Sequence, residues 1–217
     1  ASRLLPNLGS FNKYSDVGYA GLWGYTAPDA KEYALLGIRS GLSIVDVSEI
    51  NNLKEVAFIS NIKSSIWTEV KAFKNYAYVV KDSANVGLQI IDLSDLPRSA
   101  RVVNTITAYP KIHTLWVDAE RELLFLNGGS GHNTKIFSLK DPVHPEEISS
   151  FVDNPYVHDM FARGNRAYLS EIMSQSFSIY DISDILNPRL IKRVYEEDAP
   201  YISFHNSWTT FKYLSIS

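Results

Sequence analysis

The chain has 217 residues, 45% of them hydrophobic and 21% charged, so it is long enough to bury a sizeable core and is not disordered by composition. A net charge of −3, with scattered lysines and arginines, disfavours nucleic acid and anionic membranes as partners. The absence of cysteine excludes disulfides and thiolate metal sites, and no apolar run approaches the roughly 20 residues of a membrane helix.

In chain order, short apolar runs recur with a period of about 45 residues. The stretch "GLSIVDVS" at 41–48 returns as "GLQIIDLS" at 87–94, and the same period continues to Ser138 and Asp181. A second set of apolar or aromatic runs reads as strands and occupies residues 32–37, 76–80, 122–127, 166–170 and 212–217. The repeated spacing indicates one structural unit used several times.

A further column of aromatic residues precedes these runs. It consists of Trp23, Trp67, His113, His158 and His205. Together with outer alternating runs at 54–60, 100–106 and 189–195, each unit contains four strand signals. Four strands at this period predict an all-β fold, a β-propeller of four-stranded blades with about five repeats.

The predicted propeller is a single domain over residues 1–217. Its repeats lie at approximately 15–60, 61–106, 107–152, 153–197 and, in part, 198–217. Residues 3–11 are positioned to supply a closing strand, so the chain forms either a compact five-bladed ring or part of a larger propeller. "GLSIVDVS" is predicted as the third strand of a blade, with Asp46, Asp92 and Asp181 capping the turns that follow.

The first strand of a propeller blade lies nearest the axis, so residues at one register of the five inner strands meet around the channel. We therefore expect Trp23 and Trp67 to form a channel ring with the three histidines. One interpretation of this ring is structural, because ring N–H groups can satisfy backbone carbonyls while the side chains fill the channel.

The other interpretation is a metal site. His113, His158 and His205 can present neutral imidazoles to a divalent transition metal such as zinc. Glu69 or Asp159 would then serve as a carboxylate ligand, a partner of an imidazole, or a general base. No short ligand spacing such as HExxH supports this reading.

The ordered motifs "LWGYTAPDAKEYALLGIRSGLSIVDVS", "SIWTEVKAFKNYAYVVKDSANVGLQIIDLS", "IHTLWVD", "VHDMF" and "HNSW" resemble the LVIVD-repeat proteins of the choice-of-anchor B family, over about residues 15–217. The resemblance implies a β-propeller that is secreted or carried on the cell surface, without an established activity. Because the chain begins at Ala1, we expect that a leader or an anchor has been removed from a longer precursor.

Two functions follow as hypotheses. The first is an exported binding or adhesion module that recognises an extracellular ligand, which could be a protein, a polysaccharide or a small molecule. The second is a metal-dependent hydrolase of esters or lactones that uses the three channel histidines.

Overall fold

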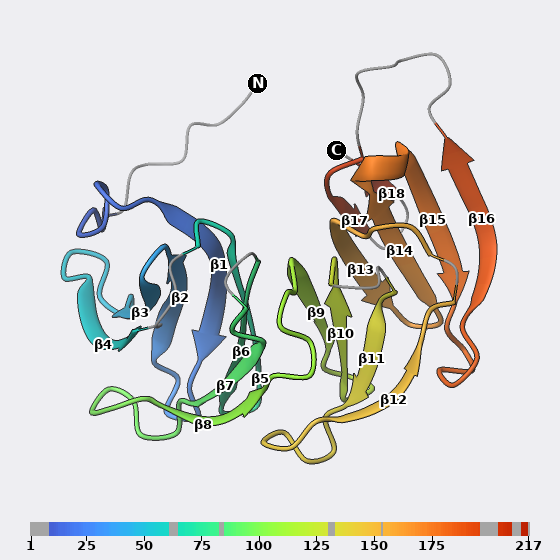
Figure 1. Cartoon of the computed structure of the whole chain (residues 1–217). Coiled ribbons are helices and arrows are strands. Elements are labelled where there is room, and N and C mark those ends of the chain that lie inside the picture. The colour runs from blue at the N-terminus through green and yellow to red at the C-terminus, as the bar shows by residue number, and fades with distance from the viewer. Residues whose placement is uncertain are drawn as a thin grey trace.

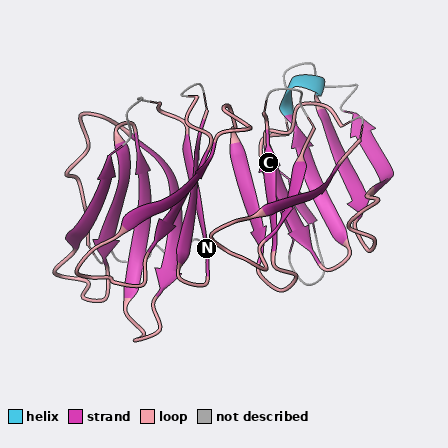
Figure 2. Cartoon of the chain, turned by 60° about the horizontal axis from the view of Figure 1, so that its bottom comes forward, coloured by secondary structure: helices cyan, strands magenta, loops and turns pink. Residues whose placement is uncertain are grey.

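The computed structural model describes residues 9–60, 65–82, 85–129, 133–152, 154–195, 204–209 and 214–216. Strands make up nearly all of its regular structure (Figure 2), with one short 3-10 helix at Ile172–Ser174. Among the described residues, no helix is long and apolar enough to cross a membrane.

Four antiparallel sheets of four strands follow one another along the chain (Figure 1). The first contains β1 (Tyr19–Thr26), β2 (Glu32–Ile38), β3 (Gly41–Asp46) and β4 (Lys54–Ser60). The second contains β5 (Thr68–Phe73), β6 (Tyr76–Lys81), β7 (Leu88–Asp92) and β8 (Arg101–Ile106). Strands within each sheet are neighbours in sequence, as expected for propeller blades.

The later sheets repeat this pattern. The third contains β9 (Thr114–Asp118), β10 (Leu123–Asn127), β11 (Lys135–Ser138) and β12 (Glu146–Ser150). The fourth contains β13 (Asp159–Arg163), β14 (Arg166–Glu171), β15 (Ser176–Asp181) and β16 (Arg189–Tyr195). A two-stranded sheet follows, made of β17 (Ser207–Thr209) and β18 (Leu214–Ile216). The prediction of an all-β fold built from four-stranded blades is confirmed.

The first strands of the sheets form the inner side of the molecule. β1 packs beside β5, β5 beside β9, β9 beside β13, and β13 beside β17. In the described part of the chain, β1 and β17 make no comparably extensive contact. Of the predicted closing strand at 3–11, residues 3–8 lie outside the described residues, and residues 9–11 are not in a strand.

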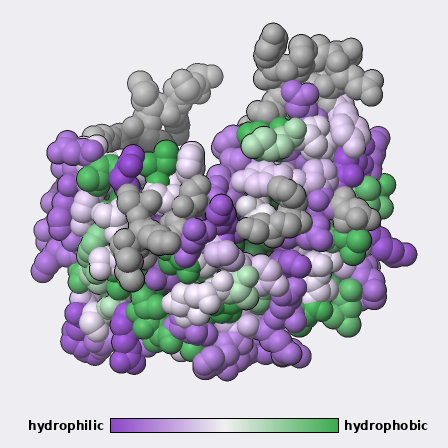
Figure 3. Space-filling view, in the orientation of Figure 1, coloured by the Kyte–Doolittle hydropathy of each residue, from purple (hydrophilic) through white to green (hydrophobic). Residues whose placement is uncertain are grey.

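The core lies between neighbouring sheets rather than in one central cluster. Between the first and second sheets, for example, Leu35 and Ile44 pack with Val79 and Ile91. Equivalent clusters lie between the second and third sheets and between the third and fourth. On the face seen in Figure 3, hydrophobic residues are interspersed with hydrophilic ones. Each sheet therefore depends on its neighbour to bury its apolar face.

The motif "GLxIxDxS" forms the third strand of its sheets, as predicted. Asp46, Asp92 and Asp181 each accept a hydrogen bond from the backbone N–H two residues later, at 3.0, 2.9 and 2.9 Å. These bonds close the turn that leads to the outer strand. The predicted capping role of the three aspartates is confirmed.

Candidate functional site

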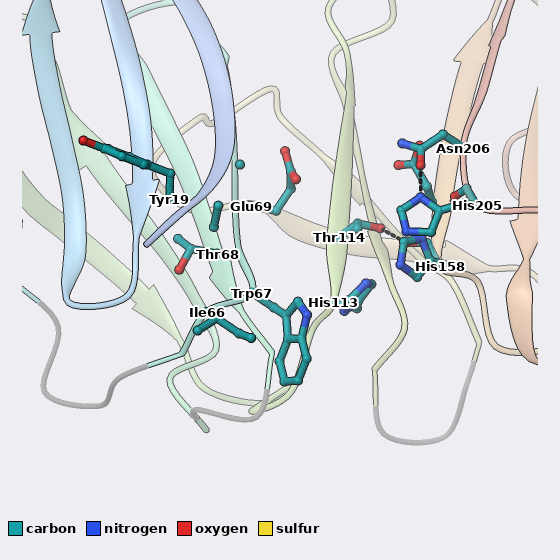
Figure 4. Close-up of a pocket in the computed structure, with 13 residues that line it drawn as sticks. Tyr19, Ile66, Trp67, Thr68, Glu69, His113, Thr114, His158, His205 and Asn206 are labelled. Carbon is teal, nitrogen blue, oxygen red and sulfur yellow. Dashed lines mark hydrogen bonds between the residues drawn. The ribbon is translucent and has the colours of Figure 1, made fainter. Parts of the chain in front are cut away.

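A pocket of about 450 Å³ lies where the inner strands begin (Figure 4). All five inner strands, or the residues just before them, contribute to its wall. The lining residues are Tyr19, Ala20, Gly21, Ile66, Trp67, Thr68, Glu69, His113, Thr114, His158, Asp159, His205 and Asn206. The structure thus brings together six of the seven predicted site residues at the mouth of the channel.

The three histidines form a row across this pocket. The ring centroids of His113 and His158 are 4.4 Å apart, and those of His158 and His205 are 4.0 Å apart. The backbone N–H groups of His113 and His158 bond to carbonyls of their own second strands, at 2.9 and 2.8 Å. This anchoring holds the residue before each inner strand at the same level of the channel.

Each histidine uses its Nδ1 atom for a contact within the protein. Nδ1 of His113 lies 3.0 Å from Oδ2 of Asp82, and Nδ1 of His158 lies 3.1 Å from the carbonyl of His205. Nδ1 of His205 contacts Oδ1 of Asn206. A carboxylate, a carbonyl and an amide oxygen can only accept hydrogen bonds, so each Nδ1 carries the proton.

The assignment of the Asn206 amide follows from its second contact. Its Nδ2 atom donates to Oδ2 of Asp159 at 3.1 Å, which leaves Oδ1 as the atom facing His205. When the three imidazoles are neutral, their Nε2 atoms therefore all carry a lone pair and act as acceptors.

His158 is held in the neutral form. Burial lowers its pKa to about 4, and the neighbouring His113 and His205 act in the same direction. The central ring of the row therefore stays uncharged at neutral pH.

Two channel carboxylates lie next to the histidine row. Glu69 forms an ion pair with Lys71, whose ammonium also lies 4.6 Å from the ring centroid of Trp23. Burial raises the pKa of Asp159 to about 6, although Lys71 opposes this effect. At pH 7 most of the Asp159 side chains are ionised, and a modest fall in pH protonates them.

Hydrophobic side chains at the rim remain open to solvent. Trp67 is 50% exposed, Ile66 is 43% exposed and Tyr19 is 40% exposed. An exposed tryptophan beside polar groups offers a flat apolar face to a bound molecule.

The structure does not place Trp23 in the ring with the histidines. Trp23 lies within β1, one layer further along the channel, where its ring meets that of Trp116 edge to face at 6.2 Å. Because additional residues precede Trp23, β1 begins already at Tyr19. Tyr19, Ala20 and Gly21 therefore line the pocket instead of Trp23. Motif spacing alone therefore misplaces the first member of the column by a few residues.

Sequence reasoning missed Asp82 and Asn206, which orient the outer two histidines. Asn206 directly follows His205 in the sequence, and this position next to a predicted site residue could have identified it. Asp82 directly follows a strand of another sheet, β6, and only the packing of two sheets brings it to His113.

The predicted metal ligands are neighbours, and their rings are tilted to one another by 54° and 48°. Within the described ranges, no group of three His, Asp or Glu side chains is arranged to hold a metal ion. Metal binding by His113, His158 and His205 stays a prediction.

The blades and their shared channel define the class of this protein as a β-propeller. Residues 68–101, which span β5 to the start of β8, match the LVIVD repeat. The chain is thus a β-propeller that carries an LVIVD repeat in its second blade. A search of curated proteins finds no significant match.

Solved structures share the fold at low sequence identity. A periplasmic gluconolactonase from Pseudomonas aeruginosa has a TM-score of 0.65 at 12% identity, covering 92% of this chain and 64% of its own. A functionally unknown protein from Desulfotomaculum acetoxidans has a TM-score of 0.64 at 14% identity, covering 82% and 56%. A protein from Lactobacillus plantarum has a TM-score of 0.63 at 10% identity, covering 80% and 54%. The chain spans between about half and two thirds of the length of these structures.

Proposed function

We propose that this propeller is an exported ligand-binding module that holds a small molecule at the mouth of its channel. The observation that carries the proposal is the pocket itself. It combines the half-exposed Trp67 with polar side chains from several inner strands in a volume of about 450 Å³. Apolar walls with a few converging polar groups are typical of small-molecule sites.

Export is part of the same proposal. It is supported by the resemblance to surface-anchored LVIVD-repeat proteins and by the periplasmic location of the gluconolactonase that shares the fold. A protein or a polysaccharide as the ligand would instead need contacts that extend beyond the pocket.

The test is a thermal-shift screen of the whole chain against sugars, amino acids, organic acids and amines, followed by mapping of hits through amide chemical shifts. We expect hits that shift amides around the pocket and that lose about ten-fold or more in affinity in Trp67→Ala. His144→Ala, on an exposed loop outside the pocket, is the matched control. If the ligands bind Trp67→Ala with the same affinity as the native chain, the binding surface lies elsewhere and the proposal is wrong.

A metal-dependent hydrolase is the second candidate. Ligating histidines usually donate their other ring N–H to an oxygen acceptor, and all three channel histidines do so here. Elemental analysis of protein purified without a histidine tag tests this candidate, with the triple His113, His158 and His205 to Ala variant as control. About one equivalent of a transition metal that the variant lacks would favour it. No metal, even after incubation of the folded protein with zinc, would eliminate it.

A further inference from the structure

The polar groups that line the pocket differ in how many are free to bind a ligand: few donors are free, and several acceptors are. Most of the side-chain donors are already bonded within the protein. The hydroxyl of Thr68 donates to the carbonyl of Ile38 at 3.2 Å, and that of Thr114 donates to the carbonyl of His158 at 2.8 Å. The hydroxyl of Tyr19 donates to the carbonyl of Phe11 at 3.2 Å.

The polar groups left for a ligand are mainly acceptors. The Nδ1 protons of the three histidines are engaged, so the row offers Nε2 lone pairs. Asn206 directs its Nδ2 atom to Asp159 and its Oδ1 atom to His205. Among the described side chains of the lining, the remaining donors are the indole N–H of Trp67 and the second N–H of the Asn206 amide.

Around the pocket, negatively charged side chains also outnumber positively charged ones. Three carboxylates, those of Glu69, Asp82 and Asp159, lie in or next to the lining. Among the described residues the nearby ammonium groups are those of Lys71 and of the buried Lys81, which lies behind Thr68 on the carbonyl of Ile38. Lys71 is already occupied by Glu69 and by the ring of Trp23. The field at the pocket is therefore negative when the histidines are neutral.

We infer that the pocket selects a small organic cation, whose ammonium or guanidinium N–H groups bond to the Nε2 atoms and whose charge is balanced by Asp159 and Glu69. This inference rests on the proposed binding function and names its ligand class. Such a cation has donors and no acceptors, which complements the wall described above. Trp67 supplies an aromatic face on which the charged group or its carbon frame can rest. A sugar, which both donates and accepts, would leave half of its hydrogen-bonding capacity unmatched.

Three probes of nearly equal size test the preference for positive charge: cyclohexylammonium, cyclohexanol and cyclohexanecarboxylate. Each is titrated at pH 7 into the isotopically labelled chain, and affinity is measured from amide chemical shifts around the pocket. We expect the ammonium to bind about ten-fold more tightly than the alcohol, and the carboxylate to bind most weakly. Added salt should narrow the difference between the ammonium and the alcohol.

Variants then locate the source of the preference. Asp159→Asn and Glu69→Gln should each weaken binding of cyclohexylammonium by about three-fold or more and so reduce the ratio of its affinity to that of cyclohexanol. Asp141→Asn removes an exposed carboxylate outside the pocket and should change neither affinity.

The outcomes separate this inference from the binding function on which it rests. If the alcohol or the carboxylate binds as tightly as the ammonium and still shifts the amides of the pocket, the pocket binds ligands but does not select cations. If none of the three probes shifts these amides, cation selection is also wrong. The screen with Trp67→Ala decides the binding function independently.

Discussion

His158 occupies the most constrained position of the site, between two other imidazoles. Burial disfavours a second proton on its ring, and so do the neighbouring rings of His113 and His205, whose centroids lie 4.4 and 4.0 Å away. Its Nδ1 proton already bonds to the carbonyl of His205. His158 is therefore stable as a neutral ring that carries its proton on Nδ1.

This arrangement predicts a loss of stability in mild acid. The pKa of His158 is about 4 in the folded chain against an ordinary value of 6.5, so the unfolded chain binds the proton first. The contribution of His158 is fully present above about pH 6.5 and is lost as the pH falls toward 4. After allowance for solvent screening, we expect the free energy of unfolding to fall by about 1–2 kcal/mol over this pH range because of His158. Urea unfolding of the native chain and of His158→Asn at several pH values in this range measures this loss. If the free energy of unfolding changes with pH in the same way for both proteins, the prediction is wrong.

Asp159 has the opposite pH dependence. Its folded pKa of about 6 lies above its ordinary value of 3.8, so its ionisation reduces stability as the pH rises from about 4 to 6. Asp159→Asn keeps an acceptor for Asn206 and should raise the free energy of unfolding at pH 7 by about 1 kcal/mol. Denaturant titrations at pH 4 and pH 7 provide the check, since the gain should shrink at pH 4. An equal gain at both pH values would argue against a raised pKa.

The sequence located most of these residues but not their chemistry. The 45-residue spacing was enough to align the three histidines, because each directly precedes or nearly precedes an inner strand. It failed for Trp23, since an insertion before a strand changes the register without changing the period much. The tautomers depend on Asp82 and on a backbone carbonyl, contacts that form only when sheets pack together.

At the scale of single strands, the glycine that opens the repeated motif has a clear structural reason. A Cβ atom at Gly41 would lie 2.1 Å from the carbonyl oxygen of Ile59, and one at Gly87 would lie 2.2 Å from that of Ile106. The third strand thus begins where the backbone of the fourth strand passes closely. The close approach of the neighbouring strand therefore explains the glycine at this position.

Gly87 combines this crowding with a φ of +82°. Gly87→Ala should therefore lower the free energy of unfolding by about 2 kcal/mol or more, through steric conflict and backbone strain together. Gly164→Ala is the matched control, because Gly164 has a φ of +55° but open space around its Cα. Gly164→Ala should lower the free energy of unfolding by only about 1 kcal/mol. Chemical unfolding of both variants tests this difference. If both substitutions lower the free energy of unfolding equally, the steric conflict with Ile106 does not contribute to the effect at Gly87.

For the whole molecule, repeated packing explains why the architecture was readable from sequence. Each of the first three sheets places apolar residues of its second and third strands against the next sheet, so the same spacing recurs in these units. The side chain that ends the second strand varies from sheet to sheet: it is Ile38 in the first, Lys81 in the second, Asn127 in the third and Glu171 in the fourth. The polar contacts made by these residues are therefore not predicted by the sequence period.

Lys81 makes a buried polar contact between the first two sheets. It is 1% exposed, and its ammonium donates to the carbonyls of Arg39 at 2.8 Å and Ile38 at 3.4 Å. Both carbonyls have a second donor, the N–H of Ser65 and the hydroxyl of Thr68 respectively. Removing the ammonium therefore leaves neither carbonyl without a partner, while it removes the cost of burying a charge.

Lys81→Met should consequently raise the free energy of unfolding by about 1 kcal/mol at pH 7. Burial lowers the pKa of Lys81 to about 8, below the ordinary 10.5, so the unfolded chain retains the proton to higher pH. The native chain should gain stability as the pH rises from about 8 to 10.5, and Lys81→Met should lack this gain. Exposed Lys54→Met serves as the control in the same denaturant titrations. A variant that is less stable than the native chain at pH 7 would show instead that the ammonium holds the two sheets together.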